Sequence, residues 1–278
     1  MGAMGLVVSI FSFESHGMMR ALNIAATGMA AQETNVSTIS NNIANVNTNA
    51  FKKGRVEFED LYYQTIQEAG GRSSANTKYN VGIQIGSGVK TAAVRKDFSK
   101  GNPIITNNTF DLMIRGEGFF GIQMPNGEIR FTRDGSFNVN SQGNLVTSSG
   151  YPIAPGITLP PGIKSVNISK NGNVDAYLPN QLEPTNVGTI PVFTFINPAG
   201  LTSAGGNLLA ATSSSGAPIQ NIAGENASGA VLQGTLESSN VSIMNEMTTL
   251  IKAQRAFEMN SKVMGIADQM LQTVNNVR

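Results

Sequence analysis

Apolar residues recur every seven positions near the beginning of the chain, between Met19 and Val46. Further apolar residues follow three positions after members of this column, and this spacing predicts a long helix with the narrow apolar seam of a coiled coil. Gly28 lies inside the pattern and costs the helix about 1 kcal/mol relative to alanine. The helix therefore needs a partner to be stable. The residues expected in its self-assembly seam are Leu22, Met29, Val36, Ile39 and Ile43.

A second helical pattern at the other end of the chain supplies a candidate partner. Between Ser242 and Val277 an entirely apolar column repeats every seven residues, and neighbouring apolar residues widen the stripe beyond a two-helix seam. Packing within one chain alone would leave the flanks of this stripe exposed, so we expect packing between copies. The residues expected to mediate it are Ile243, Met247, Leu250, Phe257, Met264 and Leu271.

Between the two helices the pattern changes to short strands separated by turns. Asn126-Gly127 and Asp134-Gly135 are typical of hairpin turns, and they predict an all-β middle. Residues 201–229 are rich in Gly, Ser, Ala and Asn, a composition typical of a loop that lies on the surface. The expected strands are 89–94, 104–114, 119–124, 128–131, 136–139, 145–146, 166–168, 174–178 and 190–196.

The long segment from Tyr62 to Val89 joins the first helix region to these strands. Its part between Gly70 and Asn80 lacks apolar periodicity and predicts an extended loop. Aromatic and aliphatic residues on either side carry enough apolar area to lie on a neighbouring copy, so we expect a lateral clasp. The expected clasp residues are Tyr62, Tyr63, Ile66, Tyr79 and Ile83.

The predicted fold class is α+β, with long N- and C-terminal helices in a coiled-coil-like core domain, a central all-β domain and an extended linker segment. Residues 1–17 hold a short apolar patch without the basic residues of a secretory signal, and we expect them to be a non-native or unstructured leader. The other expected parts are a discontinuous helical polymerisation domain (18–50 and 240–278), the linker or clasp segment (51–90) and the β domain (91–239).

Composition excludes several classes of function. The 19 basic and 18 acidic residues give a net charge of +1, and the basic residues are scattered, which argues against nucleic-acid binding. Without cysteine the chain cannot form a thiolate zinc site, and because its single histidine, His16, lies in the expected leader, the rest of the chain has no imidazole for catalysis. No apolar run reaches the roughly 18–20 residues of a membrane span. We therefore expect no catalytic site, metal, cofactor or direct membrane insertion.

Two motifs resemble binding sites but fail on context. Residues 116–121 match G-x-G-x-x-G, yet a dinucleotide site needs a helix directly after the glycines, and here strand-like residues follow. A tight strand bend with buried Phe119 and Phe120 is the better interpretation. Glu57, Glu59 and Asp60 match no calcium loop, and we expect them on a solvated helix face.

Three separated stretches, read together, resemble the bacterial flagellar axial family of rod and hook proteins. Ala50, within the first stretch, departs from the family's pattern, because the family usually has glycine at this position. Glycine is the residue that most easily adopts a left-handed turn. The resemblance covers nearly the whole chain after Met19, and the order and spacing of the three stretches argue against chance similarity. The stretches are 25–32 with 40–52, 111–120 with 131–137, and 233–241 with 254–258 and 268–271.

The resemblance implies a structural subunit that is exported unfolded without a cleaved signal peptide and polymerises in the periplasm. The segment running from Phe58 to Val89 points to the distal rod, a hollow helical tube that transmits motor torque to the hook; the alternative is another axial subunit, of proximal rod or hook type. The implied partners are further copies of the chain, proximal rod proteins, hook or hook-junction proteins, the ring proteins of the outer membrane and cell wall, and the export apparatus.

Two other classes compete with this interpretation. An enzyme is supported only by the glycine-rich residues 116–121, and a monomeric β-rich adhesion module would share the predicted strands. Sedimentation of the purified chain over time distinguishes the second class from a polymer subunit, and a nicotinamide or flavin titration tests the first.

Overall fold

The computed structural model describes residues 3–67, 81–179 and 183–276. Its two helices lie at the two ends of the chain and strands occupy the middle, which confirms the α+β class. The chain forms two compact units, the first comprising Met1–Ile43, Gly54–Arg95 and Ile243–Arg278, and the second Ala44–Lys53 and Lys96–Ser242. The expected boundary at residues 90 and 91 falls inside a strand of the first unit, and residues 44–50 belong to the second unit instead of the helical one.

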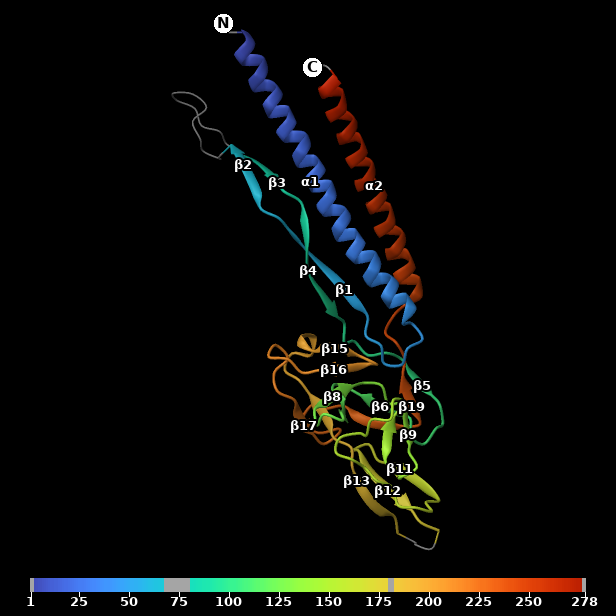
Figure 1. Cartoon of the computed structure of the whole chain (residues 1–278). Helices are drawn as coiled ribbons and strands as arrows, with labels where there is room; N and C mark the ends of the chain where they lie inside the picture. The colour runs from blue at the N-terminus through green and yellow to red at the C-terminus, as the bar shows by residue number, and fades with distance from the viewer. Residues whose placement is uncertain (1–2, 68–80, 180–182, 277–278) are drawn as a thin grey trace. The chain divides into compact units, whose positions relative to one another are not determined.

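The first unit contains two long helices, α1 (Ala3–Ala44) and α2 (Ile243–Asn276). They lie side by side, and the beginning of α1 and the end of α2 lie at the same end of this unit (Figure 1). Two described contacts join them: Asn42 donates to Glu246 over 3.2 Å, and Asn260 lies against Gly28. Helix α1 begins at Ala3 and therefore extends through most of the segment expected to be a non-native or unstructured leader; no proline interrupts the helix upstream of Met18.

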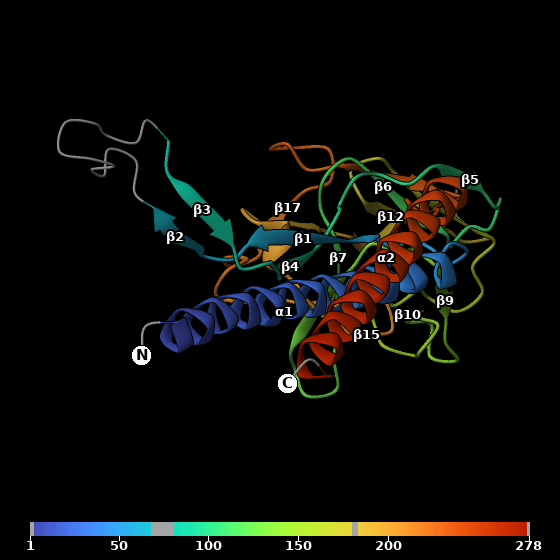
Figure 2. The ribbon, with the colours of Figure 1, turned by 90° about the horizontal axis from the view of Figure 1, so that it is seen from above.

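A long β-hairpin completes the first unit and runs along α1 (Figure 1, Figure 2). Leu61 N donates to Gly88 O over 2.9 Å and Ser87 N to Tyr62 O over 3.2 Å, so the two ladders of the hairpin are continuous. The expected extended linker is therefore a paired ribbon on both sides of 70–80, and residues 70–80 themselves lie outside the described residues. The ladders are β1 (Gly54–Asp60) with β4 (Val89–Lys96) and β2 (Tyr63–Gln67) with β3 (Ile83–Gly86).

The acidic residues of β1 are not on a helix, so that expectation is wrong. Glu57 pairs across the ladder with Arg95 at 2.6 Å and, along its own strand, with Arg55 at 3.1 Å; Glu59 pairs across the ladder with Lys90 at 3.1 Å. Hydrogen bonds from Arg95 and Arg55 hold the pKa of the Glu57 carboxyl below its usual value. Cross-strand pairing of opposite charges is the stabilising pattern that alternating charged residues produce in a ladder.

The second unit is built from small antiparallel sheets. The largest has four strands in the order β15-β16-β8-β7. Residues 201–229 contain β15, β16 and β17, so the expectation of a loop there is wrong. The elements are β5 (Pro103–Ile105), β6 (Leu112–Arg115), β7 (Phe120–Gln123), β8 (Ile129–Thr132), β9 (Phe137–Val139), β10 (Leu145–Thr147), β11 (Ser165–Ile168), β12 (Asn173–Tyr177), β13 (Thr185–Thr189), β14 (Val192–Thr194), the 3₁₀ helix η1 (Pro198–Gly200), β15 (Thr202–Gly205), β16 (Leu208–Ala210), β17 (Ile219–Asn221), β18 (Ala230–Gln233) and β19 (Thr235–Glu237).

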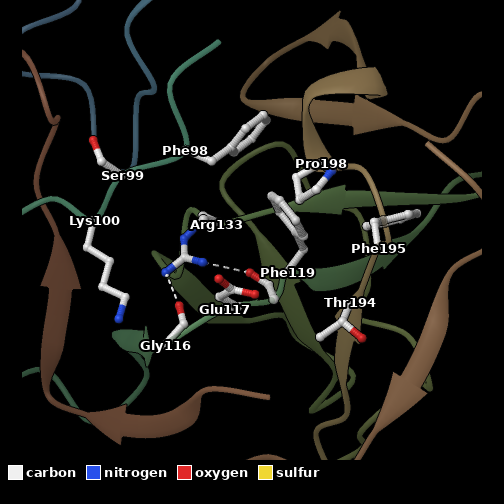
Figure 3. Close-up of a pocket in the computed structure, with 11 residues that line it drawn as sticks. Phe98, Ser99, Lys100, Gly116, Glu117, Phe119, Arg133, Thr194, Phe195 and Pro198 are labelled. Carbon is white, nitrogen blue, oxygen red and sulfur yellow. Dashed lines mark hydrogen bonds between the residues drawn. The ribbon is translucent and has the colours of Figure 1, made fainter. Parts of the chain in front are cut away.

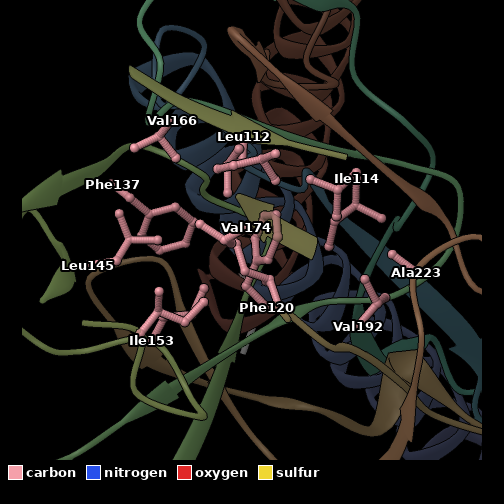
Figure 4. Close-up of a cluster of buried hydrophobic side chains, with 14 of the residues drawn as sticks. Leu112, Ile114, Phe120, Phe137, Leu145, Ile153, Val166, Val174, Val192 and Ala223 are labelled. Atoms are coloured by element: carbon pink, nitrogen blue, oxygen red, sulfur yellow. The ribbon is translucent and has the colours of Figure 1, made fainter. Parts of the chain in front are cut away.

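Two hydrophobic clusters hold this unit together. The larger one is shown in Figure 4, where Phe120 and Val174 lie in the middle; the Phe120 and Phe137 rings meet edge to face at 5.3 Å. The smaller one is built mainly from phenylalanines and includes Phe119 and Phe131. The chain bends at Gly116, between β6 and β7, as expected, and Phe119 and Phe120 after this bend are both buried. Gly116 and Gly118, with φ of 142° and 127°, make that bend possible.

Candidate assembly surfaces and a buried ionic junction

A buried cluster of three charged side chains lies in the β unit. Glu237, the last residue of β19, is 1% exposed. The Nζ of Lys52 lies 2.6 Å from Glu237 Oε1, and the Nε of Arg133 lies 2.8 Å from Glu237 Oε2. The side chains of Lys52 and Arg133 are also buried. We call these three residues the ionic junction.

Every charged group of the ionic junction has further hydrogen bonds. Lys52 Nζ donates to the Ser99 carbonyl over 2.8 Å, and Gly101 N donates to Glu237 Oε1 over 2.9 Å. The Arg133 guanidinium donates to the backbone carbonyls of Ile114, Gly116 and Gly118, and Figure 3 shows it pointing toward Gly116. Such complete pairing is what allows three charges to be buried, because an unpaired buried charge costs several kcal/mol.

The ionic junction keeps its carboxyl group ionised. Burial alone raises the pKa of Glu237, but the positive charges of Arg133 and Lys52, with the hydrogen bonds from Lys52 and Gly101, outweigh burial and hold that pKa below its usual value. Burial lowers the pKa of Lys52, against the attraction of Glu237. The cluster therefore depends on the negative charge of Glu237, which balances two neighbouring cations.

Backbone and amide contacts tie three chain segments to this cluster. Ala50 N donates to the Glu237 carbonyl over 2.8 Å. Lys53 N donates to Asn240 Oδ1 over 2.8 Å, and Asn240 Nδ2 donates to the Asp97 carbonyl over 2.8 Å. Each segment borders a point where the chain passes to the first unit. The junction therefore anchors the connections of the β unit.

Sequence reasoning missed the ionic junction, although its members belong to the three stretches that resemble the rod and hook family. Lys52 lies in the first stretch, Arg133 in the second and Glu237 in the third. Charged residues are only 13% of the chain, so a charge next to apolar residues, as Glu237 follows Leu236, is a signal that could have identified them.

Ala50 adopts the left-handed conformation that the family usually assigns to glycine. Its φ is 55°, and its N–H bonds to the Glu237 carbonyl. The turn is therefore present although alanine pays a steric cost of roughly 1–2 kcal/mol there.

Asn42 joins three elements of the helical unit and was also missed. It lies on α1 and is 2% exposed. Its Oδ1 accepts from Gly54 N over 2.8 Å, and its Nδ2 donates to Gly54 O and to Glu246 of α2. Asn42 therefore connects α1 to the hairpin and to α2.

The expected seam of α1 is partly covered in the single chain. Ile39 is buried, while Leu22, Met29, Val36 and Ile43 are half-buried. Gly28 and Asn42, the α1 residues whose contacts with α2 are described, lie one position before members of the expected column. The predicted column is therefore beside the line along which the two helices meet.

Helix α2 leaves most of its large apolar side chains exposed. Phe257 is 41% exposed, and Ile243 and Met247 are exposed as well. Leu250, Met264 and Leu271 of the expected set are half-buried. We call the exposed set the α2 apolar face; beyond the expected residues it includes Met244, Ile251, Met259, Val263, Ile266 and Met270.

The expected clasp residues that the structure describes are also exposed. Tyr62 is 93% exposed, and Tyr63, Ile66 and Ile83 are exposed on β2 and β3. Tyr79 lies outside the described residues. These side chains have the accessibility that contact with another copy requires.

Two other features, a cluster of metal ligands and a membrane-spanning helix, are not found in the described parts of the chain. No group of three or more His, Asp or Glu residues is placed there to hold a metal ion. No described helix combines the length and apolarity needed to cross a bilayer.

Comparison with known proteins identifies relatives for nearly the whole chain. The family model for flagella basal body rod proteins matches residues 22–52, that for the flagellar hook protein FlgE/F/G D1 domain matches 113–176, and that for the flagellar basal body rod FlgEFG protein C-terminal region matches 232–277. The flagellar basal-body rod protein FlgG of Caulobacter vibrioides is 47% identical over 261 residues, 94% of this chain and all of that protein. Its counterpart in Borreliella burgdorferi is 47% identical over 263 residues, 94% of this chain and 99% of that protein. The FlgG protein of Buchnera aphidicola subsp. Schizaphis graminum is 44% identical over 260 residues, 94% of this chain and all of that protein.

Proposed function

Because the chain belongs to the flagellar hook and basal-body rod family and is a structural subunit of the distal rod, we propose that it works by polymerising into a hollow helical tube that transmits motor torque to the hook. Its place is the flagellar basal body, where it assembles with other axial components. The terminal helices pair in a coiled-coil-like core around the channel. The chain reaches the periplasm through the export apparatus without a cleaved signal peptide, contacts proximal rod, hook or hook-junction and ring proteins, and has no catalytic role.

The α2 apolar face is the observation that supports polymerisation most directly. Its side chains are exposed in the single chain although α1 already lies beside α2. Apolar surface of this extent is unfavourable in water and is typical of an interaction site. Contacts that join different surfaces of identical subunits and do not close into a ring generate a helical filament.

Phe257 offers a direct test of this proposal. Because it is 41% exposed in the single chain, Phe257→Asp leaves the chain folded, whereas polymerisation would bury an unpaired carboxylate. We expect electron micrographs of the concentrated variant to lack filaments, while Phe257→Leu, which keeps an apolar side chain, forms them. Filaments of normal length and number from Phe257→Asp would show that the α2 apolar face is not the assembly surface.

A further inference from the structure

The β unit contains an aromatic pocket with charged residues at its rim. Its volume is about 520 Å³. It is lined by residues 98–100 and 116–119, by Thr194, Phe195 and Pro198, and by Arg133 of the ionic junction. Figure 3 shows Lys100 on one side of the pocket, Phe195 and Pro198 on the other, and Glu117 and Phe119 between them. We call it the phenylalanine pocket.

The apolar wall of the phenylalanine pocket is held in place by its neighbours. The Phe98 and Phe119 rings meet edge to face at 5.6 Å, and Phe119 and Phe195 meet at 5.8 Å. The Arg133 guanidinium lies 6.0 Å from the centre of the Phe119 ring and is itself fixed by the Gly116 and Gly118 carbonyls. A further aromatic ring entering the pocket would add edge-to-face contacts to a preformed surface.

The rim of the pocket carries one cation and one carboxylate. Lys100 and Glu117 are both exposed, and in the described parts of the chain no ion pair or hydrogen bond engages either side chain. A complementary ligand therefore has an aromatic body, a carboxylate for Lys100 and a hydrogen-bond donor for Glu117.

The hairpin of the first unit presents this combination. Tyr62, at the junction of β1 and β2, is 93% exposed, and its backbone carbonyl is held by Ser87 N. Asp60 is the exposed last residue of β1. Side chains two residues apart in extended backbone point to the same side, so Asp60 and Tyr62 form one aromatic and acidic knob.

We propose that the phenylalanine pocket of one copy binds Tyr62 of a second copy. The tyrosine ring packs against Phe98, Phe119 and Phe195, its hydroxyl donates to Glu117, and Asp60 pairs with Lys100. The knob and the pocket are different surfaces, so the contact is heterologous and extends a polymer instead of closing a dimer. This inference rests on the proposed polymerisation and adds a specific pair of surfaces to it.

The absence of cysteine from the chain makes the contact directly testable. A chain with Tyr62→Cys is mixed with a tagged, longer chain with Lys100→Cys, the mixture is polymerised and oxidised, and disulfide-linked mixed dimers are identified by size on a non-reducing gel. Because each chain carries one cysteine, a mixed dimer can form only between copies. The matched control replaces the Lys100→Cys chain with Ser141→Cys, an exposed residue of the same unit.

We expect a mixed dimer from Tyr62→Cys with Lys100→Cys, dependent on polymerisation and absent from the Ser141→Cys control. Sedimenting polymers without enrichment of this dimer would overturn the inference and leave the proposed function intact. A cross-link within a single chain carrying both cysteines, at concentrations too low for polymers, would overturn it too. Polymerisation of the unsubstituted chain is measured first, because a chain that forms no polymer would contradict the proposed function itself.

Charge reversal provides a second, independent measurement. Lys100→Glu should slow polymer growth about tenfold, the loss expected from a repulsive rim pair. Adding Asp60→Lys to the same chain restores the attraction and should recover most of the rate. Equal rates for all three chains would contradict the assigned pairing of Asp60 with Lys100.

Discussion

Asn260 of α2 lies against Gly28 of α1 so closely that a Cβ carbon at position 28 would be 2.7 Å from its Nδ2. This contact explains why a glycine occupies the interior of a long helix, where it costs about 1 kcal/mol relative to alanine. The two helices approach one another at the position that has no side chain.

Enlarging residue 28 should therefore separate the helices. Gly28→Leu places a branched side chain where Asn260 lies, and we expect loss of filaments in electron micrographs. Gly28→Ala is the matched control, because the Asn260 amide is the movable end of a side chain and the gain in helix propensity offsets its displacement. Filaments from the leucine variant as abundant as those from the alanine variant would disprove this role for Gly28.

Removing the negative charge of Glu237 should destabilise the β unit strongly. Glu237→Gln leaves Lys52 and Arg133 buried without a compensating charge, and we expect the free energy of unfolding to fall by about 3 kcal/mol. Urea unfolding followed by tyrosine fluorescence measures the loss. As a control, Glu59→Gln removes a carboxylate from an exposed pair and should change stability by less than about 1 kcal/mol.

The same carboxylate predicts a dependence of stability on pH. Because the pKa of Glu237 is lower in the folded than in the unfolded chain, its contribution is complete above the unfolded pKa and is lost as pH falls through the folded pKa. We expect the unsubstituted chain to lose stability below about pH 4.3, the ordinary value for glutamate. Glu237→Gln should show a shallower decline over this range, and identical slopes would contradict the ionised state assigned to the junction.

Ala50 is a position where glycine should stabilise the chain. Its φ of 55° is strained for alanine but not for glycine, so Ala50→Gly should raise the free energy of unfolding by about 0.5–1 kcal/mol, the steric relief less the greater freedom of glycine in the unfolded chain. Thermal unfolding measures the change. Asn49→Gly, at a neighbouring position without positive φ, should lower stability instead.

The exposed side chains of β2 and β3 support a prediction about stiffness. If Tyr63, Ile66 and Ile83 contact a neighbouring copy, the hairpin hinders sliding between rows of subunits, so deleting residues 70–80 should give polymers that form but curve. Curvature is measured in electron micrographs. A Gly- and Ser-rich replacement of equal length separates the effect of residue identity from that of length, and deleted polymers as straight as the unsubstituted ones would assign stiffness to the helices alone.

The sequence predicts helices and strands correctly where one side of the element is buried, because burial then produces a periodic pattern of apolar residues. Prediction fails for elements that lack such a pattern. Both terminal helices and most central strands were predicted, because heptad spacing and turn residues are local signals. The hairpin was missed because β2 is exposed along nearly its whole length and lacks the alternation that marks a half-buried strand. The ionic junction was missed because Lys52 and Glu237 are 185 residues apart, and only the folded chain brings them together.

The chain passes between its two units four times, at 43/44, 53/54, 95/96 and 242/243. Tension applied to one unit is therefore divided among four connecting segments of the chain that act in parallel. Lys53, Asp97 and Asn240, each within a few residues of a different crossing, are hydrogen-bonded to one another through the Asn240 side chain. A force on any one of these three connecting segments is shared with the other two through these hydrogen bonds before it reaches the β-sheets. The three segments therefore resist the force together.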